Sequence, residues 1–138
     1  MPDGIDLILA DHERVNALFA LFESTQDGAI IAQVMDALTA HDDAEQAALY
    51  PLAANVLGDT ALMARWLGAH SRVKLQMDLI RHLEGPPLVA AFRTLEELIA
   101  RHVQDEEQNL LPALRERATP GQLDGLAAHI EQAKQRGG

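Results

Sequence analysis

A chain of 138 residues with 48% hydrophobic residues has the size of one domain and enough apolar side chains to bury a core, so we expect a single domain over residues 1–138. Its formal net charge of −10 argues against nucleic acid or an anionic membrane as a partner. The absence of cysteine excludes disulfides, thiol catalysis and iron–sulfur clusters, so any metal site must use imidazole and carboxylate groups.

The composition favours helix throughout. Ala, Leu, Glu and Gln are abundant, while β-branched and aromatic residues are few, and we expect no strand. The N-terminal segment has no basic start and too short an apolar run for a signal peptide. No stretch approaches the roughly 18 apolar residues of a membrane span. We therefore expect a cytoplasmic protein.

The first half of the chain predicts two helices. Apolar residues recur at helical spacing over about 5–23, and His12 lies within that stripe. A turn with capping residues follows at 24–28, and a second helix runs over about 29–55. Pro51 is expected to kink this helix or to end it early, because proline removes a backbone donor.

The second half predicts two more long helices. The third begins near residue 60, carries His70 on its apolar face and ends at Gly85-Pro86-Pro87. The fourth extends over about 88–114. Thr119-Pro120 then starts a short amphipathic C-terminal helix.

An internal repeat links the two halves. HDDAEQAALYP from His41 matches HVQDEEQNLLP from His102, and both share His-x3-Glu-x3-Leu-x-Pro. The His and the Glu lie four residues apart, so they project from the same side of a helix. A single histidine precedes each copy, His12 in the first half and His70 in the second. The chain therefore consists of two similar halves.

The spacing of these four histidines predicts that they meet at one height. In antiparallel helices, residues equidistant from the connecting turn lie level with each other. The midpoints between successive histidines fall between residues 26 and 27, between 55 and 56, and at residue 86, each in or beside a predicted turn. We therefore predict an all-α fold, an up-down-up-down four-helix bundle with a short C-terminal helix.

The converging polar residues predict a metal site. A buried carboxylate is costly unless it is neutralised, paired or metal-bound, and no Lys or Arg is repeated beside the two glutamates. Four imidazoles and two carboxylates are too many for one tetrahedral zinc and suit two metals about 3.5–4 Å apart. Such ligands are typical of non-haem iron, with zinc or manganese as alternatives. The predicted ligands are His12, His41, Glu45, His70, His102 and Glu106.

The combination of motifs resembles the hemerythrin-like (HHE) domain family over nearly the whole chain. The motifs are Asp11-His12-Glu13, His41-x3-Glu45 with Leu49-Tyr50-Pro51, His70, and His102-x3-Glu106 with Leu110-Leu111-Pro112. The resemblance implies a left-twisted four-helix bundle around two non-haem irons with an oxo or hydroxo bridge, which bind dioxygen, peroxide or nitric oxide. It also implies that His12 and His41 serve one iron, that His70 and His102 serve the other, and that Glu45 and Glu106 bridge them.

Two positions depart from the family pattern. Hemerythrins proper have a second histidine one turn after the third-helix ligand, where this chain has Lys74, and its absence leaves an extra open coordination position. They also place the last carboxylate five residues after the histidine, which would select Glu107. Four residues turn a helix by about 40° net and five by about 140°, so we predict Glu106 unless a π-bulge intervenes.

Five other residues near the predicted site receive smaller roles. Trp66 is expected to pack over the site and keep it dry, and Tyr50 to pack rather than to act in redox chemistry. Asp11 and Asp105 are candidates to orient ligands as hydrogen-bond acceptors. Asp42 is assigned to a polar helix face.

Three functions remain open at this point. The first is a carrier, scavenger or sensor that binds dioxygen, nitric oxide or peroxide. The second is a di-iron enzyme that consumes peroxide or oxygen, which open coordination positions would allow. The third is a protein that stores or donates iron, or holds zinc. We expect small-molecule partners, an unidentified redox partner, no nucleic acid or membrane partner, and a monomer or weak dimer.

Overall fold

The computed structural model describes residues 2–137, and apart from short turns these residues are helical. The elements are α1 (Gly4–Thr25), α2 (Gly28–Ala44), η1 (Glu45–Leu49), α3 (Tyr50–Leu57), α4 (Thr60–Ile80), α5 (Gly85–Asp105), η2 (Glu106–Leu110), α6 (Leu111–Arg117) and α7 (Pro120–Gly137). The prediction of an all-α protein is confirmed, since this range contains no strand.

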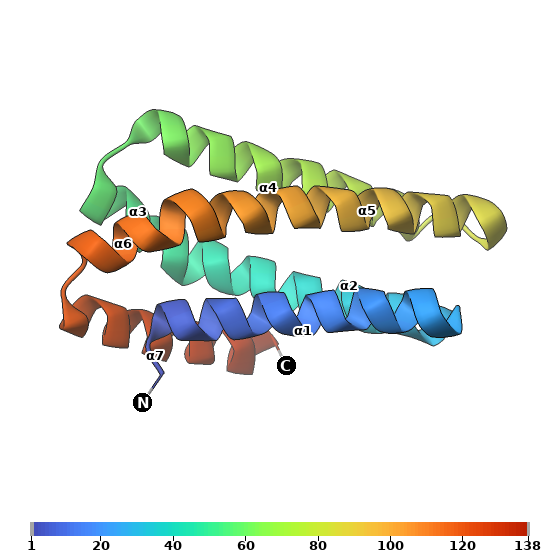
Figure 1. Ribbon diagram of the computed structural model, residues 1–138, viewed down its shortest axis with the longest axis horizontal. Helices are drawn as coiled ribbons and strands as arrows, with labels where there is room; N and C mark the ends of the chain where they lie inside the picture. The colour runs from blue at the N-terminus through green and yellow to red at the C-terminus, as the bar shows by residue number, and fades with distance from the viewer. Residues whose placement is uncertain (1, 138) are drawn as a thin grey trace.

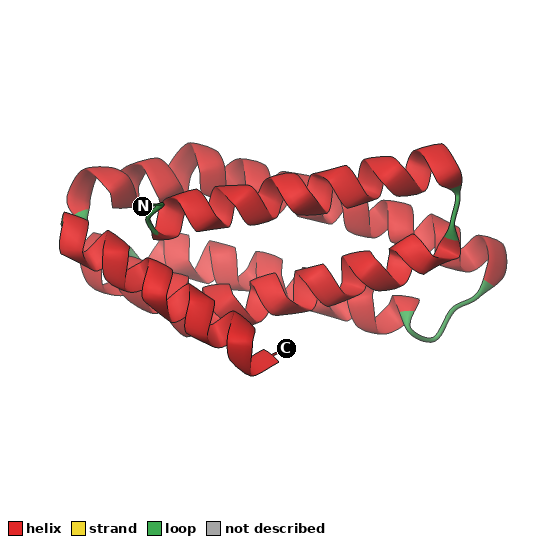
Figure 2. Ribbon diagram, turned by 90° about the horizontal axis from the view of Figure 1, so that it is seen from below, coloured by secondary structure: helices red, strands yellow, loops and turns green. Residues whose placement is uncertain are grey.

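The four long helices α1, α2, α4 and α5 lie along a common direction, as Figure 1 shows. α1 packs against α2, and α4 packs against α5. The pieces η1 and α3 continue α2, while η2 and α6 continue α5. At the end where these continuations lie, α7 runs across α1 and α2, as the view from below shows (Figure 2).

Aspartates start three of the long helices. Asp3 caps α1 and forms a capping box with Asp6, in which each side chain accepts from the other residue's backbone N–H. Asp27 and Asp59 accept from backbone N–H groups at the starts of α2 and α4. Such caps satisfy donors that have no partner inside the helix, which is why the predicted turns fall where they do.

A π-helical turn begins at the predicted ligand glutamate in each half of the chain. The N–H of Tyr50 donates to the carbonyl of Glu45, five residues back, and the N–H of Leu111 donates to that of Glu106. In both cases the second residue after the turn is a proline, in the first turn of the next helix. Proline has no N–H and crowds the carbonyl four residues back, so the helix widens there. The helix continues past Pro51 to Leu57 rather than ending early.

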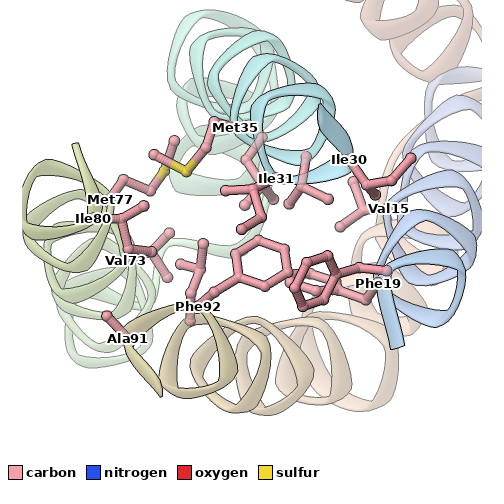
Figure 3. Packing of buried hydrophobic residues seen from close by; sticks show 14 residues of the cluster. Val15, Phe19, Ile30, Ile31, Met35, Val73, Met77, Ile80, Ala91 and Phe92 are labelled. Atoms are coloured by element: carbon pink, nitrogen blue, oxygen red, sulfur yellow. The ribbon is translucent and has the colours of Figure 1, made fainter. Parts of the chain in front are cut away.

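Two apolar clusters fill the interior and leave a polar layer between them. One joins α1, α2, α4 and α5, and Figure 3 shows Phe19 and Phe92 among its residues. The centroid of the Phe92 ring lies 5.0 Å from that of Phe19 and 4.9 Å from that of Phe22. The other joins the start of α1 to η1, α3, α6 and α7 and contains Trp66. Each large side chain buried in this way stabilises the fold by roughly 1.5–3 kcal/mol.

The C-terminal helix is longer than the short helix that the sequence predicts. α7 spans 18 residues, and its apolar residues Leu123, Leu126 and Ile130 belong to the second cluster. Leu126 lies so close to Gly4 that a Cβ atom at Gly4 would be 2.3 Å from its Cγ. α7 is therefore an integral part of the packed domain. None of the helices within residues 2–137 is both long and apolar enough to cross a membrane.

Candidate metal centre

Six buried polar side chains come together in the layer between the two apolar clusters. They project from four helices and from the first residues of both π-helical turns. They are His12 on α1, His41 on α2, Glu45 on η1, His70 on α4, His102 on α5 and Glu106 on η2. These are the six residues that the sequence predicts as ligands, and all of them lie at one level of the structure.

The six residues form two groups of four within the described part of the chain. In each group, one ligand atom per residue lies within 4.8 Å of the others. The first group contains His12 and His41, and the second contains His70 and His102. Glu45 and Glu106 belong to both groups. The arrangement therefore offers two adjacent cation positions that share two carboxylates.

The two oxygens of Glu45 face different histidine pairs. Its Oε2 lies 3.2 Å from Nε2 of His41, which belongs to the first group. Its Oε1 lies 2.9 Å from Nε2 of His70 and 3.8 Å from Nε2 of His102, which belong to the second. One carboxylate thus spans both cation positions.

Glu106 is divided in the same way. Its Oε1 lies 3.2 Å from Nε2 of His12, and its Oε2 lies 3.0 Å from Nε2 of His102. The side chain is fully buried, so water does not solvate it. Glu106 and Glu45 are therefore equivalent in geometry, as they are in the sequence repeat.

Unpartnered atoms at the centre test whether these residues fit a cation. Nε2 of His12, Oε2 of Glu45 and Oε1 of Glu106 are buried without a hydrogen-bond partner among the described residues. Leaving such groups unsatisfied is expensive, particularly when they carry charge. A cation between them would bind all three atoms at once. The donor set therefore fits metal ions.

Without a bound cation, the carboxylates and imidazoles stabilise each other's charged forms. Burial opposes ionisation of Glu45, but the charges and hydrogen bonds of His41, His102 and His70 outweigh it and hold its pKa well below the ordinary value. Burial would lower the pKa of His41, but Glu45 and Asp11 raise it to about 10. Protons therefore compete with cations for this centre.

In three of the four histidines, the outer ring nitrogen Nδ1 is hydrogen-bonded to a carboxylate. Nδ1 of His41 donates to Asp11 at 3.0 Å, and Nδ1 of His12 donates to Glu107 at 2.7 Å. Nδ1 of His70 donates to Asp42. Each of these three contacts fixes the orientation of an imidazole ring and leaves its Nε2 directed at the centre. Metal-binding histidines are usually supported in this way.

Asp11 also connects the centre to the C-terminal helix. It is buried and accepts hydrogen bonds from Lys134 on α7 and from Arg14. Burial alone would raise the pKa of its carboxyl, but the bonds from His41 and Lys134 outweigh burial and lower the pKa to about 2. α7 therefore helps to keep this carboxylate ionised and directed at His41.

Tyr50 lies in the centre and does more than pack. Its hydroxyl donates a 2.7 Å hydrogen bond to Oε2 of Glu106 and lies 3.2 Å from Nε2 of His102. Its ring meets that of His70 edge to face, with centroids 4.9 Å apart. Burial, together with Glu45 and Glu106, raises the pKa of the phenol, so Tyr50 is neutral and acts as a donor.

The structure separates Glu106 from Glu107. Glu106 points inward and is fully buried, whereas the side chain of Glu107 is 40% exposed and contacts the outer nitrogen of His12. The π-helical turn begins at Glu106 and widens the helix only after it. Lys74, at the position of the family's additional histidine, is exposed.

Trp66 and Asp105 show how far the remaining predictions hold. Trp66 is completely buried and belongs to the second apolar cluster, and its predicted role of keeping the site dry stays a prediction. Asp105 does not support a ligand but pairs with Arg65 on α4 at 2.7 Å. Sequence reasoning missed the roles of Asp42 and Glu107. Each lies beside a predicted ligand on a partly polar helix face, and helical periodicity does not indicate which residue of a neighbouring helix such a side chain contacts.

A small cavity adjoins the centre. Its volume is about 20 Å³, and its walls combine site residues with apolar side chains. The lining residues are Leu38, His41, Asp42, Glu45, His70, Val73, Ile99 and His102. A space of this size holds about one water molecule. A wider acidic groove of about 430 Å³ opens on His12 and Glu107 and contains Glu13 and Glu96.

Comparisons with known proteins bear on this geometry. A family model of the hemerythrin HHE cation binding domain matches residues 3–114. A Nostoc sp. protein described as a DNA nickase is 28% identical over 137 residues, covering 95% of this chain and 39% of that protein. The chain thus spans about two fifths of the length of that relative. The crystal structure of a hemerythrin HHE cation binding domain-containing protein from Mycobacterium kansasii has the same fold, with a TM-score of 0.81, 20% identity, and coverage of 99% of this chain and 90% of that one.

Proposed function

Because the chain belongs to the hemerythrin HHE cation-binding domain family, we propose that its buried centre holds two non-haem irons and binds dioxygen, peroxide or nitric oxide. The proposed ligands are His12, His41, Glu45, His70, His102 and Glu106. In this proposal α1, α2, α4 and α5 act as an up-down-up-down bundle that holds the ligands level. Imidazole and carboxylate ligands without thiolate suit iron, although zinc and manganese accept the same donors.

The division of the two glutamates carries the proposal. Each directs one oxygen at the first histidine pair and the other at the second. A mononuclear site would not require this division, whereas two cations bridged by carboxylates do require it. Each position then has four protein donors, which leaves room for an exogenous ligand beside them.

The surroundings select a small ligand. Two irons supply redox chemistry and coordination positions for dioxygen, peroxide or nitric oxide. The adjoining cavity of about 20 Å³ has the size of a small molecule, and Leu38, Val73 and Ile99 form its apolar side. The Tyr50 hydroxyl donates to Glu106 and is a neutral donor at the centre. These residues position a small ligand and limit access of bulk water.

Metal content and an optical spectrum test the proposal directly. The protein would be expressed with iron and purified without chelator or affinity metal. We expect about two irons per chain and near-ultraviolet absorption that shifts when azide or peroxide is added. A matched Glu45→Gln variant should bind less iron, because Glu45 is shared by both positions. A colourless protein with one zinc or no metal would contradict the di-iron proposal.

Consumption of peroxide is the second candidate function. It is favoured because the chain has Lys74 where hemerythrins proper have an additional histidine, so that histidine does not fill a further coordination position. Oxygen release from peroxide by the iron-loaded protein would support it. Reversible azide binding without peroxide consumption would instead favour a carrier or sensor.

The description of the Nostoc relative raises DNA cleavage as a function of that longer protein. We propose no nucleic-acid partner for this domain, because a net charge of −10 repels phosphate groups. Incubation of the iron-loaded domain with supercoiled plasmid, in the absence of added peroxide, tests this point. Nicking that a chelator abolishes would contradict it.

A further inference from the structure

Three of the four site histidines have a carboxylate on Nδ1, and the fourth has none. Asp11, Asp42 and Glu107 hold His41, His70 and His12, respectively. Nδ1 of His102 is buried and has no hydrogen-bond partner among residues 2–137. The support of the centre is therefore complete around three histidines and missing at one.

The three carboxylates follow a regular order around the four helices. Each lies next in sequence to one site residue and reaches the histidine of a neighbouring helix. Asp11 precedes His12 on α1 and reaches His41 on α2. Asp42 follows His41 on α2 and reaches His70 on α4. The ring of supporting contacts would be complete if a carboxylate next to His70 on α4 reached His102 on α5.

The sequence repeat identifies the residue that interrupts this order. Ala69 immediately precedes His70, just as Asp11 immediately precedes His12. In the first half, that position supports the histidine of the following helix, and His102 is its counterpart in the second half. Ala69 has only a methyl group and cannot accept a hydrogen bond. By the repeat, Ala69 is therefore the position from which a carboxylate would reach His102.

A carboxylate on Nδ1 strengthens a metal-binding histidine. It fixes the tautomer in which Nε2 carries the free lone pair, and it raises the basicity of the ring. Loss of such a partner typically weakens metal binding by roughly 10–100-fold. His102 must bind with an unsatisfied Nδ1–H, which carries a further cost in a buried position.

We propose that the two cation positions are unequal, and that the position served by His70 and His102 is the weaker, exchangeable one because Ala69 leaves His102 without a carboxylate. This inference rests on the proposed function, in which the six residues bind two cations. It predicts that the centre fills in two steps. The position of His12 and His41 fills first, and the position of His70 and His102 fills second.

Stepwise binding of Co²⁺ tests the inference without any catalytic assay. Metal-free protein would be titrated with Co²⁺ while its visible absorption is followed, and EDTA would then be added to measure release. We expect two steps that differ in affinity by at least about tenfold, and one ion that leaves faster than the other. His102→Ala should remove the weaker step and leave the stronger one.

The decisive variant is Ala69→Asp, which supplies the missing carboxylate. It should tighten the weaker step by roughly 10–100-fold and leave the stronger step unchanged. Ser71→Asp is the matched control, because it places the same charge on the opposite side of His70, at an exposed position of α4. It should leave both steps nearly unchanged. Circular dichroism would verify that both variants are folded.

The outcomes separate this inference from the proposed function. Two Co²⁺ ions that bind with equal affinity and leave at equal rates, or an Ala69→Asp variant that behaves like Ser71→Asp, would overturn the inference and leave the two-cation centre intact. A protein that binds a single Co²⁺, with or without the new carboxylate, would overturn the two-cation proposal and the inference together. Release rates of the unchanged protein decide the matter even where a variant fails to fold.

Discussion

The hydroxyl of Tyr50 donates a 2.7 Å hydrogen bond to Oε2 of Glu106, the glutamate of the other half of the chain. Tyr50 directly follows the first π-helical turn, and Glu106 begins the second. The bond therefore joins the two repeats at the level of the metal centre.

Removing this hydroxyl tests its role. Tyr50→Phe keeps the ring that packs on His70 but leaves Glu106 without its neutral donor. We expect iron content to be retained, the absorption and azide affinity of the iron-loaded protein to change, and the metal-free protein to lose about 1 kcal/mol of unfolding free energy. Urea unfolding in EDTA measures the loss, and unchanged stability together with an unchanged spectrum would leave Tyr50 as a packing residue.

Glu106 and Glu107 should differ sharply on substitution. Glu106→Gln removes a carboxylate that both cation positions share, so the variant should hold fewer than two irons per chain. Glu107→Gln only weakens the support of His12, so we expect about two irons at saturation with roughly 10–100-fold lower affinity. Metal analysis after dialysis at several free iron concentrations separates the two. Equal losses in both variants would contradict the assignment.

Metal binding should release protons and strengthen as pH rises. Without a cation, burial disfavours the charged form of His102, but hydrogen bonds that its ring donates to Glu106 and Glu45 raise its pKa to about 9, and the pKa of His41 is about 10. Both imidazoles are therefore protonated at pH 7 and must lose that proton to bind metal. Titration of weakly buffered metal-free protein with Co²⁺ should acidify the solution. Proton release should vanish above about pH 10.

The stability of the metal-free protein should show the opposite trend. A histidine whose pKa is raised from 6.5 contributes stability that is complete below pH 6.5 and is lost as pH rises through the folded pKa of about 10 for His41. For Asp11 the sign reverses, because its lowered pKa contributes stability above 3.8 that is lost as pH falls through about 2. Melting of the protein in EDTA at pH 6, 8 and 10 measures the first effect. Constant melting temperatures over that range would contradict it.

Gly4 gives a prediction about packing that needs no metal. Replacing glycine by alanine inside a helix normally stabilises by about 1 kcal/mol, but here the new Cβ would meet Leu126. Gly4→Ala should instead destabilise by about 1–3 kcal/mol. Gly125→Ala on α7, where the added Cβ meets nothing within 4 Å, is the matched control and should be neutral or stabilising. Urea unfolding compares the two, and a stabilised Gly4→Ala would show that α7 is loosely held.

Much of the centre could be predicted from the sequence, because histidines and glutamates at fixed spacing report helix faces and turn positions directly. His41 and Glu45 stand on one face by helical period alone. The role of Tyr50 could not be predicted in this way. The π-helical turn bonds Tyr50 to the residue five positions back, which brings it round to the side of Glu45. A regular α-helix would have turned it away.

The supporting carboxylates show a different limit of the sequence. Asp42 and Asp105 are both partly buried aspartates next to the site, yet one holds His70 and the other pairs with Arg65. Which neighbour each side chain reaches depends on how the helices are rotated against each other, and the helical period of one chain segment does not contain that information. The full length of α7 depends on tertiary contacts in the same way, since Lys134 near its polar end donates to the buried Asp11.

The sharing of both glutamates by the two cation positions bears on how such a centre can arise. Each half supplies one complete histidine pair and one carboxylate, and that carboxylate also serves the pair of the other half. Two identical helical hairpins related by a two-fold axis could therefore build the same centre as a symmetric dimer. Fusion of the hairpins into one chain releases them from this symmetry. Asp11 and Ala69, at matching positions of the two halves, are a difference that only the fused chain can carry.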